Sequence, residues 1–154
     1  HTLIVPLPFV NAAFWMIPIH VLQKVGGFCP LFYHYGEDKD FVNRLHYHQY
    51  QVGYSPQVFG NHDREYRPLT HEGFLRTESV YHLSEYVNIN HPWLKAFGYG
   101  VLAVMKKALT SLISGKFQLS KDYLRMGFQL LSRSTEIQSY RKINRLSQPH
   151  YIQK

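Results

Sequence analysis

The sequence predicts an α/β fold, of the α+β kind within this chain, with a few short strands followed by a mostly helical C-terminal region. Two observations lead to this expectation. The apolar run Phe9–Ile17 is typical of a largely buried strand. Beyond Arg67, residues 70–72 indicate a helix start, and apolar residues from Leu94 to Leu112 recur at helical spacing. The 154 residues are enough for one domain with a hydrophobic core.

The first half of the chain alternates short elements with turns. After the strand 9–17, Pro18 suits the first turn of a helix over 20–25, which Gly26-Gly27 ends. An aromatic loop follows, and Gly36 allows a tight turn into a helix from about 38 to 48. Residues 50–59 contain a turn and a short strand.

The second half is predicted to be three helices, over about 70–87, 94–112 and 120–132, with a basic tail that frays. Its longest charge-free apolar stretch is 96–105, about half the length that a membrane span needs. That stretch is therefore expected to be a buried helix or a helix lying in the membrane interface, and both readings stay open.

The charges divide the chain into two expected parts, 1–66 and 67–154. The first part has four Lys or Arg and five Asp or Glu, and the second has thirteen and five, a formal charge of +8. This asymmetry favours an anionic partner for the second part. Nucleic acid is not expected, because the basic residues are dispersed and form no recognition motif. The one cysteine, Cys29, excludes an intrachain disulfide and is expected to be a small buried residue.

Three carboxylates stand together at the predicted start of the helix 38–48. Glu37, Asp38 and Asp40 directly follow Gly36. A helix N-terminus carries unpaired N–H groups and a partial positive charge, which favour ionised carboxylates. Such an acid can cap the helix, bind a metal or accept a proton.

A series of short motifs resembles the acceptor half of the family 2 glycosyltransferases, which have the GT-A fold. The series covers about residues 9–66, and its members occur in the order that the family shows. They are Asn11-Ala12-Ala13, Ile17-Pro18-Ile19-His20, Val25-Gly26-Gly27-Phe28, Tyr35-Gly36-Glu37-Asp38-Lys39-Asp40-Phe41, Arg44-Leu45, Gly53-Tyr54, Pro56 and His62. The resemblance implies that this chain is the C-terminal portion of a GT-A fold.

The resemblance also implies catalytic roles. Asp38 matches the general base, which accepts the proton of the acceptor hydroxyl in a single inverting displacement. Glu37 matches the preceding acid, which would orient the acceptor or hold the loop. Asp40 is expected to cap the helix or to pair with Arg44 one turn later.

Substrate and metal contacts follow from the same resemblance. Asn11 and Trp15 lie on the segment that lines the acceptor pocket, and Tyr33 and Tyr35 are candidate sugar-binding residues. His62 matches a histidine that completes the coordination of a divalent metal, Mn²⁺ or Mg²⁺, in a subset of these enzymes. That metal is expected in the full-length enzyme, with none bound by this chain alone.

No Asp-x-Asp motif precedes Glu37, although the family's donor half has one. The chain is therefore expected to be a fragment that is inactive without its nucleotide-binding half. The full enzyme would transfer a sugar from a nucleotide-sugar to a glycan or lipid-linked acceptor in polysaccharide biosynthesis, in the cytoplasm or at the inner face of the membrane. The helical extension would cover the core, form a homodimer or hold the enzyme against an anionic membrane surface.

Two other classes of function stay open. One is a non-catalytic module for membrane docking or oligomerisation, built on residues 67–154. The other is a metal-dependent hydrolase that uses Glu37, Asp38, Asp40 and His62 as ligands, although it lacks a second suitably placed histidine.

Overall fold

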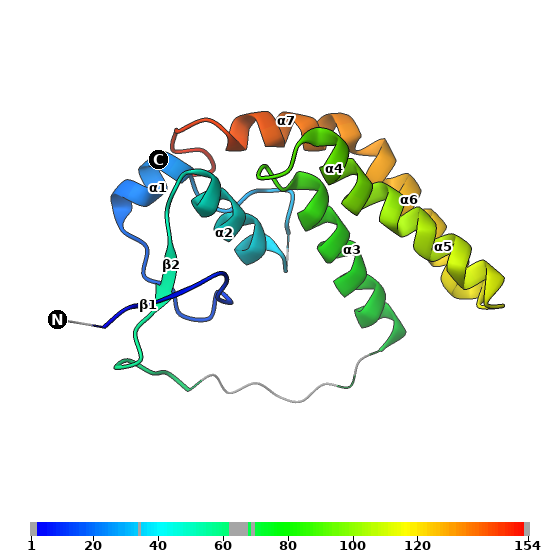
Figure 1. Cartoon of the computed structure of the whole chain (residues 1–154), viewed down its shortest axis with the longest axis horizontal. Helices are drawn as coiled ribbons and strands as arrows, with labels where there is room; N and C mark the ends of the chain where they lie inside the picture. The colour runs from blue at the N-terminus through cyan, green and yellow to red at the C-terminus, as the bar shows by residue number, and fades with distance from the viewer. Residues whose placement is uncertain (1–2, 34, 62–67, 69, 153–154) are drawn as a thin grey trace. The chain divides into compact units, whose positions relative to one another are not determined.

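The chain is mostly helical in the computed structural model, which describes residues 3–33, 35–61, 68 and 70–152 (Figure 1). Helix accounts for 58% of the structure and strand for 4%. Among the described residues, the strands form only a two-stranded antiparallel sheet. The predicted α/β portion of a GT-A fold is therefore wrong, because that fold requires a larger sheet with helices on its faces.

The chain forms two compact units. The first consists of residues 1–68 together with 143–154, and the second of residues 69–142. The C-terminal segment thus belongs to the same unit as the N-terminal half of the chain.

The sheet of the first unit pairs β1 (Val5–Leu7) with β2 (Val52–Tyr54), with Val5 opposite Tyr54. The strand predicted over 9–17 is not formed. The backbone oxygen of Asn11 instead accepts hydrogen bonds from Ala13 N at 2.9 Å and from Trp15 Nε1 at 3.0 Å, which make a local turn. An apolar run becomes a strand only where a neighbouring strand offers a ladder of hydrogen bonds.

Two helices build the core of the first unit. They are α1 (Ile19–Val25) and α2 (Glu37–Tyr47), close to the ranges expected from the sequence. Val21 and Val25 of α1 form a buried cluster with Phe41 and Leu45 of α2. The four-residue spacing within each pair places both members on one face of their helix.

Arg44 joins these two helices through polar contacts. Its side chain is fully buried, and its guanidinium donates to the carbonyl oxygens of Val25 at 2.8 Å and Gly27 at 2.7 Å. These oxygens lie at the C-terminal end of α1, where carbonyl groups lack partners within the helix and favour a cation.

The C-terminal segment closes the first unit. His150 O accepts a hydrogen bond from Gly27 N at 2.7 Å, and the Tyr151 hydroxyl donates to Asn144 Oδ1 at 2.6 Å. His48 Nε2 donates to Asn144 O at 3.0 Å. Cys29 is buried as expected, and burial raises the pKa of its thiol to about 11.

The second unit is helical. It contains α3 (His71–Val87), α4 (Trp93–Phe97), the π-helical segment η1 (Gly98–Leu102), α5 (Ala103–Ile113) and α6 (Phe117–Ser132). These elements confirm the three helices expected over about 70–87, 94–112 and 120–132. A further helix, α7 (Ser134–Asn144), occupies most of the segment that was expected to fray, and its last two residues belong to the first unit.

The segment from α4 through η1 to α5 is one continuous helix, Trp93–Ile113, of 21 residues. By length and composition it could cross a membrane, with a mean hydropathy of 1.3. The sequence-based estimate was shorter, because it counted only the charge-free residues 96–105. One side of this helix is buried, at Ala96, Val104 and Ala108 among others.

Candidate functional site

The candidate site begins where the chain turns into α2. Tyr35 has φ 69° and Gly36 has φ 89°, so two consecutive residues adopt the left-handed conformation. Glycine adopts it without strain, whereas tyrosine rarely does. Helix α2 begins directly after these two residues, so Glu37, Asp38 and Asp40 lie in its first turn.

The two acids expected to do chemistry, Glu37 and Asp38, are both partly exposed. Asp38 Oδ1 accepts a hydrogen bond from the backbone N–H of Lys39 at 2.7 Å, which fixes one of its oxygens at the helix start. Glu37 Oε2 is buried and has no hydrogen-bond partner among the described residues. The site therefore holds one positioned carboxylate and one oxygen that still lacks a donor.

Asp40 has the structural role that the sequence favoured. Its Oδ2 accepts a hydrogen bond from Arg44 Nε at 2.9 Å, and both side chains are buried. Burial raises the pKa of the Asp40 carboxyl, and the charge and hydrogen bond of Arg44 oppose that rise. This pair confirms the expected contact across one turn of the helix.

Trp15 and Asn11 are linked to each other and to α2. The Trp15 ring is half-buried and packs against Phe41 with a centroid distance of 5.7 Å. Its indole N–H is held by the backbone oxygen of Asn11, whose residue is exposed. Because Phe41 follows Asp38 by three residues on α2, Trp15 packs near the same turns of the helix that carry the acids.

The other candidate residues are less closely tied to the acids. Tyr33 is fully exposed and Tyr35 is about half exposed, at 49%. Both precede Glu37 by only a few residues, so chain connectivity keeps them near the start of α2. His62, the candidate metal ligand, lies outside the described residues.

A divalent metal was expected in the full-length enzyme. Glu37 and Asp38 offer the oxygen ligands that Mg²⁺ and Mn²⁺ prefer, and the buried Oε2 of Glu37 has no other described partner. Within the described part of the chain, no group of three His, Cys, Asp or Glu side chains is close enough to hold a metal ion. Two carboxylates alone do not fill the coordination sphere of a divalent metal.

The structure reveals a polar cluster in the second unit that the sequence did not indicate. Glu78 Oε2 accepts hydrogen bonds from Lys107 Nζ and from the Tyr123 hydroxyl, the latter at 2.9 Å. His82 lies beside it, with Nε2 at 4.0 Å from Glu78 Oε2. Glu78 and His82 lie one turn apart on α3, but Lys107 and Tyr123 come from α5 and α6, so local spacing in the sequence could not have predicted the whole cluster.

Burial and charge set the pKa values in this cluster. Burial disfavours ionised Glu78, but the hydrogen bonds from Lys107 and Tyr123 outweigh it and lower the pKa of Glu78. Burial lowers the pKa of His82, although the hydrogen bond from its Nδ1 to Tyr99 O opposes this. Burial and the carboxylate of Glu78 raise the pKa of Tyr123 to about 12.

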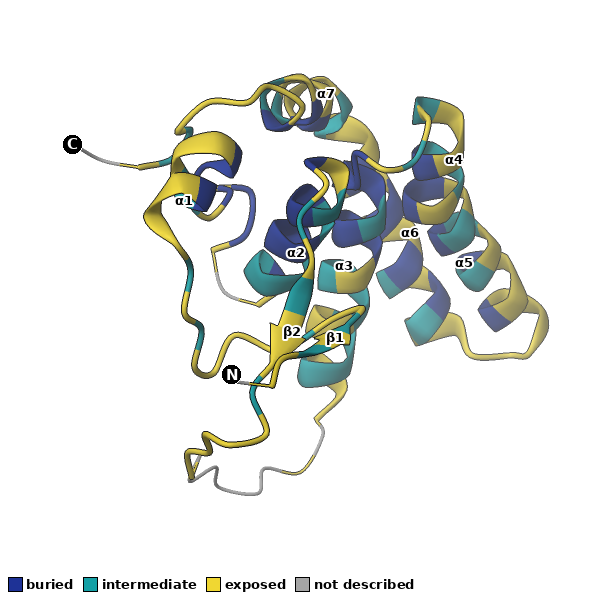
Figure 2. Cartoon of the chain, turned by 60° about the vertical axis from the view of Figure 1, so that its left-hand side comes forward, coloured by how far each residue is buried: buried dark blue, intermediate teal, exposed yellow. Residues whose placement is uncertain are grey.

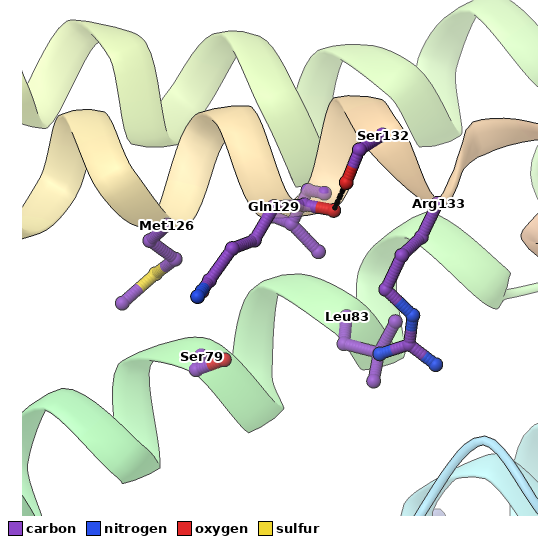
Figure 3. Close-up of a pocket in the computed structure, with 7 residues that line it drawn as sticks. Ser79, Leu83, Met126, Gln129, Ser132 and Arg133 are labelled. Carbon is purple, nitrogen blue, oxygen red and sulfur yellow. Dashed lines mark hydrogen bonds between the residues drawn. The ribbon is translucent and has the colours of Figure 1, made fainter.

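A cavity of about 340 Å³ lies between α3 and α6 (Figure 3). It contains none of the candidate catalytic residues. Its lining residues are Ser79, Leu83, Met126, Gln129, Leu130, Ser132 and Arg133. Arg133 also pairs with Glu136 at 2.8 Å, and Ser132 donates to the backbone oxygen of Gln129, so two of its polar groups already have partners.

Comparison of the chain with protein-family models, with curated proteins and with solved structures finds no match. A proposal about function therefore rests on the residues and geometry described above.

Proposed function

We propose that this chain supplies the acceptor-side residues and the catalytic base of an inverting glycosyltransferase. The observation that supports the proposal best is the pair Glu37 and Asp38 at the start of α2. Both are partly exposed, one is positioned by a backbone N–H, and the other has an oxygen that lacks a donor. The motif series around them, from Asn11 to Pro56, resembles the acceptor half of family 2 glycosyltransferases.

In the proposed reaction, Asp38 takes the proton of an acceptor hydroxyl while that oxygen attacks the anomeric carbon of a nucleotide-sugar. The bond from the anomeric carbon to the diphosphate oxygen breaks, and the nucleoside diphosphate leaves from the opposite face. One displacement inverts the configuration at that carbon. General-base catalysis of this kind requires a carboxylate within hydrogen-bond reach of the hydroxyl.

Glu37 and the aromatic residues would hold the acceptor. The free Oε2 of Glu37 can accept a hydrogen bond from a second sugar hydroxyl, which would remove the cost of an unsatisfied buried oxygen. Trp15, Tyr33 and Tyr35 offer aromatic faces and polar edges, which suit a surface that is apolar on one side and hydrogen-bonding on the other. Holding the acceptor in this way converts the transfer into an effectively unimolecular step.

The proposal concerns the site and does not depend on the α/β fold, which the structure contradicts. Catalytic groups of the same kind occur on unrelated folds, so a helical chain can carry this chemistry. Under this proposal, the donor site would lie outside these 154 residues.

The substitution Asp38→Asn tests the proposal in the full-length protein that contains this chain. It removes the proton acceptor and keeps the shape, so transfer should fall about 10²- to 10⁴-fold while binding of the nucleotide-sugar stays nearly the same. Release of nucleoside diphosphate from a panel of nucleotide-sugars measures turnover, and calorimetry measures binding.

Glu72→Gln is the matched control. Glu72 is also an acid in the first turn of a helix, α3, and it has no proposed role in the site. This variant should retain the activity of the wild type. Normal turnover of Asp38→Asn would eliminate the proposed base, as would an equal loss in both variants.

A further inference from the structure

Helices α5 and α6 carry a set of exposed apolar side chains that the proposed reaction does not use. Each of these eight residues is at least 38% exposed. We call them the apolar face. They are Leu102, Leu109, Leu112 and Ile113 from the end of η1 and from α5, and Phe117, Leu124, Phe128 and Leu131 from α6.

The two helices pack closely along one line. A Cβ atom added at Gly127 would lie 2.6 Å from Met105 Sδ, so the backbone of α6 comes near α5 at this point. Further along, the Ser120 hydroxyl donates to Ala108 O at 2.9 Å. Position 108 thus lies opposite 120 and position 105 opposite 127, which makes the pair antiparallel.

Both helices also pack against α3, on one side of that line. Tyr123 of α6 donates to Glu78 of α3, and Lys107 of α5 contacts the same carboxylate. Gly100 lies against Tyr86 of α3, with only 2.5 Å between an added Cβ and the Tyr86 Cβ. The side of the pair that faces α3 is therefore occupied.

The apolar face lies on the other side. Successive residues of an α-helix are rotated by about 100°. Going around the axis of α6, Tyr123 faces α3, Gly127 comes next and faces α5, and Leu124 and Phe128 come after it. Going around the axis of α5, Lys107 faces α3, Ala108 faces α6, and Leu109 comes next on the exposed side. In Figure 2, the buried residues of both helices lie toward α3 and exposed residues lie on the outer side.

Exposed basic side chains border this face. Lys106 lies between Leu102 and Leu109 at spacings of four and three residues, and Lys121 lies in the same way between Phe117 and Leu124. Arg125 precedes Phe128 by three residues, and Lys116 directly precedes Phe117. No described carboxylate forms an ion pair with any of these four basic residues.

The segment that carries the apolar face has a strongly positive net charge. Residues 93–133 contain seven Lys or Arg and a single acid, Asp122, for a formal charge of +6. Asp122 already accepts a hydrogen bond from His71 Nε2 at 3.1 Å. The apolar face thus lies in a positive field that no described acid beside it neutralises.

We propose that the apolar face binds the surface of an anionic phospholipid bilayer, with α5 and α6 lying in the interface. Leucine and phenylalanine side chains would enter the acyl boundary, and the bordering lysines and arginine would reach the lipid phosphates. A second copy of the chain is a poorer occupant, because two positive rims would repel. The inference is independent of the proposed glycosyl transfer.

The same geometry favours an interfacial position over a span for the helix Trp93–Ile113. This helix is long and apolar enough to cross a membrane. Its other side, however, packs on α3 and α6 through Gly100, Val104 and Ala108, and Lys106 and Lys107 lie within it. Only one side of the helix is available to lipid.

Vesicle flotation of the full chain tests the proposal. We expect binding to vesicles that contain phosphatidylglycerol, little binding to pure phosphatidylcholine, and weaker binding at high salt. The double variant Leu109→Gln/Phe128→Gln should weaken partitioning about tenfold or more, because it removes apolar contact from both helices. Lys121→Gln/Arg125→Gln should weaken binding to the anionic vesicles by about the same factor.

Matched controls place substitutions of the same kinds outside α5 and α6. Phe59 and Leu146 are exposed, so Phe59→Gln/Leu146→Gln should bind as the wild type does, and so should Lys142→Gln/Arg145→Gln. Failure of the wild type to float, or equal loss in the control variants, would overturn the proposal. So would resistance to carbonate extraction, which indicates a span, or a dimer in solution that Leu109→Gln/Phe128→Gln disrupts.

Discussion

Two buried arginines stabilise helix ends in the same way, one in each unit. Arg44 donates to carbonyl oxygens at the end of α1, and Arg141 donates to Tyr86 O, Asn88 O and, at 2.7 Å, His91 O after the end of α3. The last turn of α3 has no basic residue of its own. A distant arginine therefore supplies the cation that the helix C-terminus favours.

The pair Asp40–Arg44 should contribute more to stability than its surface counterpart Glu72–Arg76. Both pairs have the same spacing, but the first is buried and the second is largely exposed. Arg44→Ala leaves the Asp40 carboxylate buried and alone, so the free energy of unfolding should fall by about 3 kcal/mol. Arg76→Ala should change it by less than about 1 kcal/mol. Urea denaturation measures both values, and equal losses would contradict the argument.

The cluster around Glu78 and His82 predicts a loss of stability in acid. The pKa of each group is lower in the folded chain than its ordinary value, so the unfolded chain binds more protons. Both groups contribute fully to the free energy of unfolding above pH of about 6.5. Below that pH the contribution of His82 is lost, because folding makes this side chain harder to protonate. Below about 4.5 the contribution of Glu78 is lost for the same reason.

His82→Gln should remove the first of these two losses. Urea denaturation measures the free energy of unfolding at each pH. Between pH of about 6.5 and 5 this free energy should change less with pH in the variant than in the wild type. Binding of a single proton can account for up to about 1.4 kcal/mol per pH unit. The measurement at pH of about 8 is the internal control, because His82 is neutral there in both states. An unchanged slope in the variant would assign the acid sensitivity to other groups.

At the scale of elements, the close packing of η1 on α3 depends on Gly100. A Cβ there would lie 2.5 Å from the Tyr86 Cβ, while nothing lies within 4 Å of a Cβ at Gly98. Gly100→Ala should lower the free energy of unfolding by about 2 kcal/mol through overpacking. Gly98→Ala in the same element should raise it by up to about 1 kcal/mol through helix propensity. Thermal or urea unfolding checks both, and a neutral Gly100→Ala would show that η1 can move away from α3.

The helices that the sequence predicted correctly carry either a clear apolar period or clear end signals. The helix at 93–113 shows the period, and the helix at 71–87 was placed by Thr70 at its start and by the break at 88–92. Helix α7 was missed because its buried face is largely polar, with Arg141 and Asn144 buried beside Ile137. The expected strand at 9–17 failed for the opposite reason, since an apolar run does not reveal whether a partner strand exists.

The candidate site shows the same limit. The helix start at Glu37 and the pair Asp40–Arg44 could be predicted because both depend on neighbours within one turn. The contact between Trp15 and Phe41 and the cluster at Glu78 bring distant segments together. Local spacing carries no information about such contacts, so only the structure could reveal them.

At the scale of the whole molecule, the end of the chain stabilises the unit that the beginning of the chain builds. Gly27 N donates to His150 O, and Arg44 stacks near the Tyr151 ring at 5.8 Å. Deletion of residues 148–154 should therefore loosen α1 and α2 and leave α3, α5 and α6 unchanged. Hydrogen exchange should be about tenfold or more faster in α1 and α2 alone.

Tyr151→Phe is the milder form of the same experiment. It removes the hydroxyl that donates to Asn144 and keeps the ring beside Arg44, so exchange in α1 and α2 should rise by less than in the deletion. Gln148→Ala, at an exposed position, is the control and should exchange as the wild type does. Because the two units have separate cores, faster exchange spread evenly over both would show that they unfold as one.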